Sequence, residues 1–343
     1  LSITPMISDT WDGFYGSASP KDFETMLQLL YLYFDAPRFD EQAFEAILSE
    51  TKNQLKFISG NPMYVFLDTL IKTSSQNDPR VIVIPDENFL NSTSYQQAMN
   101  IYKDRFSDAG DLVFTFVGNI DEKEMMPLIE KYIGSLPTSD KKDMYKNVYY
   151  GFPKETKDLN IYVGMEDKST FGIIFSEEYE WNLKTNLCLD IFQEILDIRL
   201  VEIIREKMGG TYSPNLQFSY EKYPETKYTA LVLINCEPKK TKKISKTVFS
   251  IFNNLLTKGF TQEEMQKAKE QIKKSLEVNL EKNAYWRNYI NEQYYNGDPL
   301  NEYQEYQKIL NEITAEEVLT IIKPLFKTEH NVSVYQYPEK KKK

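Results

Sequence analysis

The chain has 343 residues, of which 41% are hydrophobic, enough for about two domains of ordinary size with a core each. Its formal net charge of −10 argues against nucleic-acid binding, because phosphate recognition needs a concentrated basic face. No apolar run in the sequence approaches the roughly 18 residues of a membrane-spanning helix.

The first half of the sequence has strong helical periodicity. The pattern predicts a helix over residues 20–34, with Ser19 as its N-cap and Pro20 at its first position, where proline is tolerated. Further helices are predicted from residue 40 past residue 55, over residues 94–106 and over residues 121–132. The segment "LVFTFVG", residues 112–118, predicts a strand.

The second half alternates strands with long helices. A helix is predicted over residues 184–208, ended by Gly209 and Gly210, since glycine adopts the left-handed conformation of a helix C-cap without strain. Strands are predicted near residues 159–163, 171–176, 212–220, 228–236 and 331–335. The other helices are predicted over residues 239–256, 262–295 and 315–326.

The two halves repeat each other at an offset of about 220 residues. "FDEQAF" from Phe39 aligns with "FTQEEM" from Phe260, and "TSYQQAMNIYKDRF", ending at Phe106, aligns with "ITAEEVLTIIKPLF", ending at Phe326. The repeat predicts an α+β fold of two homologous domains, 1–150 and 151–343, each a β-sheet with helices packed on one face. The polar segment 136–157 contains the predicted boundary.

The repeat also predicts what the first domain lacks. In the second half, two strands and a long helix precede the strand at Tyr212, and their counterparts would lie before residue 1. The first domain is therefore expected to lack its initial strands and helix, as in a piece of a longer protein, so a missing signal peptide says nothing about localisation.

Few residues carry obvious chemistry. The single histidine, His330, excludes both H-E-x-x-H and H-x-x-E-H zinc motifs within the chain, and its position favours a helix-end or strand-edge role. Two cysteines, Cys188 and Cys236, lie in apolar segments and favour buried thiols over a disulfide framework. No glycine-rich phosphate loop is present. The aromatic cluster of Tyr285, Trp286 and Tyr289 favours packing over ligand binding.

The segment "REKMGGTYSP", residues 205–214, allows two interpretations. Arg205 in the last turn of a helix complements the helix dipole, and Tyr212 at a strand start is often half-buried. Alternatively, the two side chains are hydrogen-bond donors directed at something outside this chain, brought together by a chain reversal at Gly209 and Gly210.

A family resemblance favours the second interpretation. "ILDIRLVEIIREKMGGTYSPNLQFSY" resembles the pitrilysin/insulinase family of zinc peptidases, the inverzincins. "GSASPKDFETMLQLLYLYFDAPRFDEQAF", "FVGNIDEKEMMPLIEKYIGSLP" and "NAYWRNYINEQYYNGDP" resemble its bacterial putative zinc protease branch. The resemblance covers nearly the whole chain. Its most specific element is an arginine and a tyrosine seven positions apart, with two glycines between them.

The resemblance implies the C-terminal half of a LuxS/inverzincin-like clamshell, whose N-terminal half binds Zn²⁺ through H-x-x-E-H. Arg205 and Tyr212 match the pair that completes the active site from the C-terminal half, with Gly209 and Gly210 forming the substrate-binding loop. The implied partners are the N-terminal zinc-binding half and a peptide or unfolded polypeptide substrate. The resemblance also suggests the periplasm or cell envelope of a Gram-negative bacterium.

The sequence leaves two other functions open. The chain could be a non-catalytic scaffold of the same fold, although the presence of both Arg205 and Tyr212 argues against this. It could also be a peptide-binding module that works without chemistry, which would equally explain the missing metal ligands. As half of a metalloendopeptidase, the chain alone is expected to be inactive.

Overall fold

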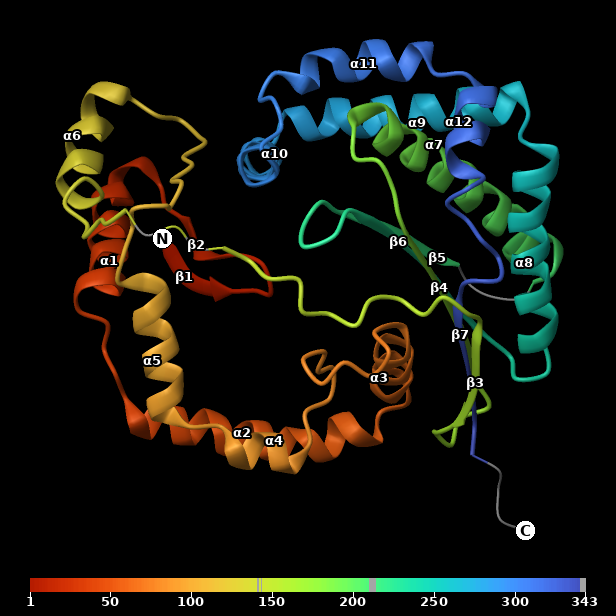
Figure 1. Cartoon of the computed structure of the whole chain (residues 1–343), viewed down its shortest axis with the longest axis horizontal. Helices are drawn as coiled ribbons and strands as arrows, with labels where there is room; N and C mark the ends of the chain where they lie inside the picture. The colour runs from red at the N-terminus through yellow and green to blue at the C-terminus, as the bar shows by residue number, and fades with distance from the viewer. Residues whose placement is uncertain (141, 143, 210–213, 340–343) are drawn as a thin grey trace. The chain divides into compact units, whose positions relative to one another are not determined.

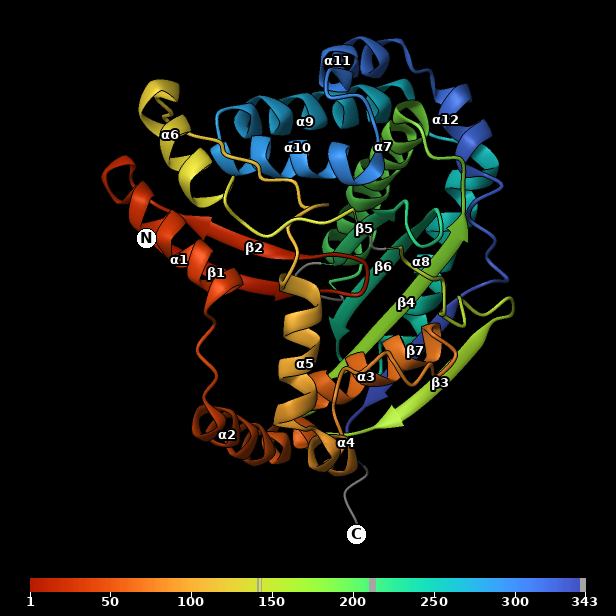
Figure 2. The ribbon, with the colours of Figure 1, turned by 60° about the vertical axis from the view of Figure 1, so that its left-hand side comes forward.

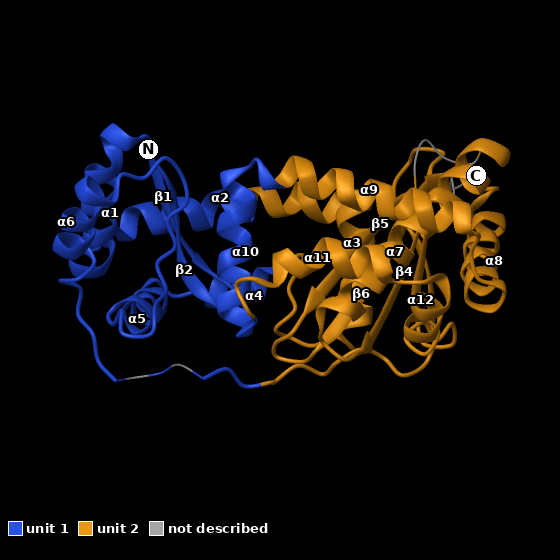
Figure 3. Cartoon of the chain, turned by 90° about the horizontal axis from the view of Figure 1, so that it is seen from above, with its two compact units in different colours: residues 1–52, 86–146, 280–298 blue, residues 53–85, 147–279, 299–343 orange. Residues whose placement is uncertain are grey.

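A computed structural model describes residues 1–140, 142, 144–209 and 214–339 of the chain (Figure 1). They form two compact units (Figure 3). Unit 1 contains residues 1–52, 86–146 and 280–298, and unit 2 contains residues 53–85, 147–279 and 299–343. The chain enters unit 2 after residue 146, near the predicted boundary, but each unit also includes residues from the opposite half of the sequence. The division into homologous domains 1–150 and 151–343 therefore stays a prediction.

Unit 1 is built on a two-stranded antiparallel hairpin and helices. β1 (Ser2–Ile7) pairs with β2 (Asp12–Ser17). A 3-10 turn (Pro20–Asp22) leads into α1 (Phe23–Asp35), whose apolar face packs with the end of α5 (Tyr95–Phe106). The other helices with residues in unit 1 are α2 (Glu41–Gly60), α4 (Glu87–Ser92), α6 (Glu122–Tyr132) and α10 (Asn283–Asn296).

The N-cap predicted at Ser19 is wrong, because its side chain accepts no hydrogen bond from the backbone of the following turn, whereas two later helices of this half are capped. Ser94 accepts a hydrogen bond from the Gln97 backbone N–H at the start of α5, and Asp121 accepts one from Lys123 at the start of α6. Ser19 instead donates its hydroxyl hydrogen bond to the Asp22 carboxylate. The helices predicted over residues 94–106 and 121–132 are thus confirmed together with their physical start signals.

The strand predicted over residues 112–118 is wrong, because this segment is irregular in the structure. Its side chains are apolar enough for a strand, and Leu112, Phe114 and Phe116 pack on the unit 1 core. However, the only strands among the described residues of unit 1 are β1 and β2, and they pair with each other. A segment with strand-like composition forms no ladder when no neighbouring strand supplies its backbone hydrogen bonds.

Unit 2 contains a five-stranded sheet in the order β3-β7-β4-β6-β5. β3 and β7 are parallel and the other pairs are antiparallel. The strands are β3 (Lys157–Tyr162), β4 (Ser169–Glu178), β5 (Asn215–Glu221), β6 (Lys227–Cys236) and β7 (Val332–Tyr337). All five were expected from the sequence, and the α+β fold class is confirmed.

Helices cover one face of this sheet. α7 (Leu183–Leu200) and α8 (Thr241–Lys258) pack on the face that carries Phe171, Ile173 and Phe175 of β4. α7 is also contacted by α11 and α12, and half of its residues, among them Leu187, Ile191 and Ile195, are buried. Unit 2 also contains the last residues of α2 and the helices α9 (Gln262–Leu280), α11 (Glu302–Glu312) and α12 (Ala315–Ile322).

The opposite face of the sheet is partly covered by α3 (Pro62–Ser74), which the sequence did not predict. Figure 2 shows α3 lying across β4 and β7. Phe66 and Leu70 are fully buried there. They pack against Ile174, Val332 and Val334, whose side chains point to this face of the sheet. Gly172 allows this approach, since a Cβ at that position would lie 2.6 Å from Phe66 Cζ.

The single helix predicted over residues 262–295 is two helices, α9 and α10. The break lies at Lys282, whose φ of −106° and ψ of 126° are extended. Trp286 Nε1 donates a hydrogen bond of 2.8 Å to the Leu280 carbonyl, so the indole satisfies an acceptor at the end of α9. The helical periodicity was correct on each side, but it could not reveal the change of direction.

Two pairs of helices recur at the spacing that the sequence predicts, although a strand follows only the second member of the later pair. α2 and α9 begin at Glu41 and Gln262, and α5 and α12 begin at Tyr95 and Ala315, both about 220 residues apart. The hairpins β1–β2 and β5–β6 precede α1 and α8. In the described part of the chain no helix is both long and apolar enough to cross a membrane.

Candidate functional site

The predicted helix end at Met208 is confirmed, but its geometry is unusual. After Leu200 the helix widens into a π-helical segment, Val201–Lys207, and the Met208 backbone N–H donates to the Ile203 carbonyl at 3.1 Å. Gly209 follows with a φ of +54°, the left-handed conformation expected of it. π-helical turns cost stability and occur often at functional sites, so the segment is a candidate on backbone geometry alone.

Arg205 lies in this π-helical segment with an exposed side chain. Its two cationic neighbours are engaged: Arg199 Nη2 donates to Glu264 Oε2 at 3.0 Å, and Lys207 Nζ lies 2.7 Å from Glu202 Oε1. Arg205 has no hydrogen-bond or ion-pair partner among the residues that the structure describes. The five donors of its guanidinium are thus left for another molecule or segment.

Two other predicted site residues, Gly210 and Tyr212, lie outside the described residues, as does the rest of 210–213. The chain is described again from Pro214, which is buried and leads into β5. The expected proximity of Tyr212 to Arg205 therefore stays a prediction. The Lys240 ammonium donates a hydrogen bond of 3.4 Å to the Gly209 carbonyl.

A cavity of about 520 Å³ lies beside the start of β5 in unit 2. Pro214, two positions after Tyr212, forms part of its wall. The polar groups that line it come from α7, from the start of β5, from the end of β6 and from α9, and they are Gln193, Glu194, Asp197, Asn215, Asn235 and Gln271. Its wall combines carboxylates with amides, and no basic side chain is among the described residues that line it.

The carboxylates of this wall belong to an acidic face of α7. Asp190, Glu194 and Asp197 are spaced by four and three residues, which places them on one side of the helix. Tyr220 Oη donates a 2.7 Å hydrogen bond to Asp190, yet burial raises the pKa of Asp190 to about 6. Burial, reinforced by the Asp197 charge, also raises the pKa of Glu194. This acidic face was not predicted from the sequence, although the spacing of its three carboxylates in "LDIFQEILD" indicates one side of a helix.

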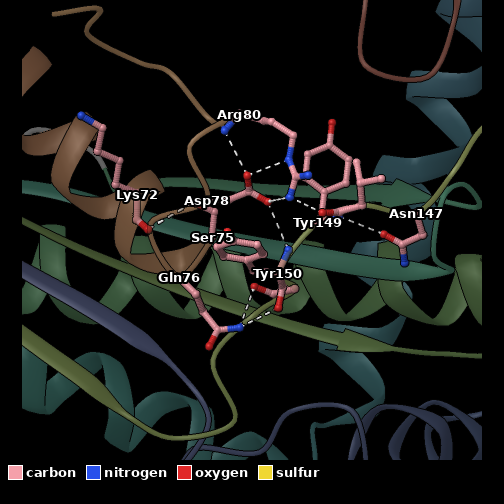
Figure 4. Close-up of polar contacts among 10 residues, drawn as sticks. Lys72, Ser75, Gln76, Asp78, Arg80, Asn147, Tyr149 and Tyr150 are labelled. Atoms are coloured by element: carbon pink, nitrogen blue, oxygen red, sulfur yellow. Dashed lines mark hydrogen bonds and ion pairs between the residues drawn. The ribbon is translucent and has the colours of Figure 1, made fainter.

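A second polar cluster, in the loop after α3, serves structure. The buried Asp78 carboxylate accepts hydrogen bonds of 2.8 and 2.7 Å from the Arg80 guanidinium, and the Tyr150 backbone N–H also donates to it (Figure 4). Arg80 holds the pKa of Asp78 down at about 2, and its guanidinium lies over the rings of Tyr149 and Tyr150. Gln76 and Arg80 also donate hydrogen bonds to backbone carbonyls of residues 148, 150 and 151. These contacts anchor residues 148–151 to the loop after α3.

His330 has a structural setting, as the sequence favours. Its Nδ1 hydrogen-bonds Glu177 Oε1 at 3.0 Å, and the same carboxylate pairs with Lys327 at 3.2 Å. Cys188 is buried as expected, and burial raises the pKa of its thiol to about 12, whereas Cys236 is only partly buried. Among the residues that the structure describes, no group of three or more His, Cys, Asp or Glu side chains is placed to hold a metal ion. The donor set of the described residues therefore does not fit zinc.

The aromatic cluster on α10 also packs as expected. Tyr285 stacks on Tyr289 with centroids 6.2 Å apart, and Trp286 meets both rings edge-on. Because Trp286 also bonds the end of α9, the cluster stabilises the α9–α10 corner.

Comparison with known proteins supports the same family that the sequence motifs suggest. Residues 92–272 match the family described as the peptidase M16 inactive domain. The probable zinc protease PqqL of Escherichia coli (strain K12) is 22% identical over 326 residues, covering 93% of this chain and 34% of that protein. The probable zinc protease PqqL of Haemophilus influenzae is 23% identical over 268 residues, covering 78% and 28%.

The solved structures agree at the level of fold. The crystal structure of the periplasmic protease PqqL from Escherichia coli superposes with a TM-score of 0.83 at 19% identity, over 98% of this chain and 37% of that one. The chain spans about a third of the length of these relatives. The family match alone covers more than half of the chain, which therefore belongs to the peptidase M16 family, as a member of its inactive-domain group.

Proposed function

We propose that the chain is the C-terminal, substrate-binding half of a zinc-dependent metalloendopeptidase that hydrolyses peptides in an enclosed chamber. The N-terminal half would bind Zn²⁺ through H-x-x-E-H and supply the metal's Lewis acidity. The residues of this chain would hold and orient the peptide. The chain alone would be inactive, because its described residues present no group able to hold the metal.

The observation that carries the proposal is that the Arg205 side chain is exposed on the π-helical segment Val201–Lys207. An exposed guanidinium that has no partner among the described residues, on a widened helical turn, is available to donate to substrate carbonyl oxygens. During peptide hydrolysis negative charge grows on the carbonyl oxygen under attack. A donor placed there typically lowers the barrier by about 3 kcal/mol. Arginine suits this role better than lysine, since its planar fork fixes the direction of the hydrogen bonds.

Tyr212 is proposed as the second donor and Gly209 and Gly210 as the loop that presents it. A phenol can donate to the same oxygen or to a neighbouring substrate carbonyl. The left-handed Gly209 supports a tight reversal at this point.

For the cellular location of the protein, we propose the periplasm or cell envelope of a Gram-negative bacterium, as for the periplasmic protease PqqL of Escherichia coli. Fractionation of cells producing the full-length protein tests this.

The test of function uses the full-length protein, which contains the N-terminal half, and zinc-dependent cleavage of a quenched fluorescent peptide. Arg205→Ala and Tyr212→Phe are each expected to lower kcat by roughly 100-fold, because a transition-state donor is lost. Lys207→Ala is the matched control. Lys207 lies two residues from Arg205 but is paired with Glu202, so its removal should change kcat by less than about threefold.

The outcomes distinguish the remaining functions. Cleavage by the wild type that is unaffected by Arg205→Ala would contradict the proposed role of the pair. A scaffold predicts no cleavage by the wild type with or without zinc. A peptide-binding module predicts peptide affinity in this chain at zero turnover of the full-length protein. Melting curves of the variants should match the wild type, since the Arg205 side chain is exposed.

A further inference from the structure

We propose that the cavity beside β5 is a subsite for a basic side chain, lysine or arginine, of the bound peptide. The inference rests on the proposed function, because it names the class of substrate that the same half would select. It depends on three features of unit 2, namely the open edge of the sheet, the polar groups in the cavity wall, and the lack of a partner for the two carboxylates of that wall among the described residues.

The first feature is the position of the cavity at a sheet edge. β5 is the terminal strand of the order β3-β7-β4-β6-β5 and pairs only with β6 among the described strands. An edge strand offers a row of backbone N–H and C=O groups to an extended peptide. Asn215, the first residue of β5, lies in the cavity wall. A peptide paired with this edge would therefore pass the mouth of the cavity.

The second feature is the chemistry of the wall. Glu194 and Asp197 supply carboxylates, and four amide side chains add carbonyl oxygens that accept hydrogen bonds. A guanidinium or ammonium can satisfy several of these acceptors at once, whereas a carboxylate would be repelled. A volume of about 520 Å³ lies within the range of pockets that hold small molecules, so a long side chain fits.

The third feature is that the charges have no counterion in the described part of the chain. Neither Glu194 nor Asp197 has a hydrogen-bond or ion-pair partner there, although both are partly buried. The raised pKa of each reports the cost of that environment. Partly buried, unpaired carboxylates lower stability, and a bound cation would remove the penalty. No third ligating side chain joins them among the described residues, which favours an organic cation over a metal ion.

The experiment measures binding to the 343-residue chain by fluorescence anisotropy. Two labelled peptides are compared that differ only in a central arginine or citrulline, which are similar in shape but differ in charge. The arginine peptide is expected to bind at least tenfold more tightly. In the Glu194→Gln/Asp197→Asn double variant this preference should fall to within twofold. The control Glu277→Gln/Glu312→Gln removes the same charge from exposed positions outside the cavity wall and should keep the preference.

The inference is overturned if the wild type binds both peptides equally, if it binds neither, or if the double variant keeps the preference. Displacement of the arginine peptide by Zn²⁺, Mg²⁺ or Ca²⁺ alone at micromolar concentration would also overturn it, in favour of a metal site. Cleavage by the full-length protein tests the proposed function separately. An active enzyme without the arginine preference rejects only this inference, and an inactive protein with the preference rejects only the proposed function.

Discussion

At the scale of single residues, Asp190 of α7 is a carboxyl group in surroundings that disfavour its charged form. Asp190 is held by Tyr220, yet burial raises its pKa to about 6 from an ordinary value of 3.8. Glu264 shows the opposite case, since the Arg199 guanidinium and the Thr261 backbone N–H lower its pKa to about 2. The two carboxylates differ because one has a cation beside it and the other has only a neutral phenol.

The state of Asp190 predicts a stabilising substitution. Because the carboxyl pKa of Asp190 is raised in the folded protein, the contribution of this group to stability is most favourable below about pH 4 and becomes less favourable as the pH rises toward 6. Asp190→Asn keeps an acceptor for Tyr220 and removes the charge. We expect it to raise the free energy of unfolding by about 1–3 kcal/mol at pH 7 and by little at pH 4. Urea unfolding at both pH values measures the difference.

Tyr220→Phe is the companion variant. It removes the hydrogen-bond donor that the described residues offer to the poorly solvated Asp190 carboxylate, so it should lower the free energy of unfolding at pH 7. A gain from Asp190→Asn that is equal at pH 4 and pH 7 would show that the charge of Asp190 is not the cause.

At the scale of elements, the position of α3 depends on one glycine. Phe66 and Leu70 fill the surface above β4 and β7, and Gly172 lets the helix approach. The start of α3 is also fixed in place, because the Asn61 side chain caps the helix and Pro62 packs against Gly164. A helix on the second face of the sheet is therefore secured by close contact at a few small residues.

Gly172→Ala is expected to lower the free energy of unfolding by about 1–3 kcal/mol, since its Cβ would lie 2.6 Å from Phe66 Cζ and 3.2 Å from Leu70 Cδ2. Denaturant unfolding measures the loss. Phe66→Leu shortens the clashing side chain, so the double variant should lose less than the sum of the two single variants. Simple additivity would mean that α3 does not sit against Gly172 as described.

At the scale of the whole molecule, the two units differ in how well their strands are supported. The sheet of unit 2 is covered by α7 and α8 over a large buried core. The hairpin of unit 1 has only two strands, and its residues are partly exposed along their length. Two-stranded hairpins are only marginally stable without further packing.

Hydrogen exchange should report this difference. Under native conditions, amides of β4, β6 and α7 are expected to exchange slowest, and those of β1, β2 and residues 112–117 at least tenfold faster. Mass spectrometry of peptic peptides resolves these segments. Equal protection of the β1–β2 hairpin and the central strands would contradict the unequal stability of the units.

The sequence by itself determined the local events and the family. Helix starts at Ser94 and Asp121, the left-handed Gly209 and the repeat spacing follow from interactions within about one helical turn or from internal similarity. Tertiary structure decided the rest. It determined that residues 112–118 form no strand, that the helix breaks at Lys282, that α3 packs on the second face of the sheet, and that a cavity lies beside β5. Each depends on partners distant in the chain, and no local pattern encodes whether such a partner is present.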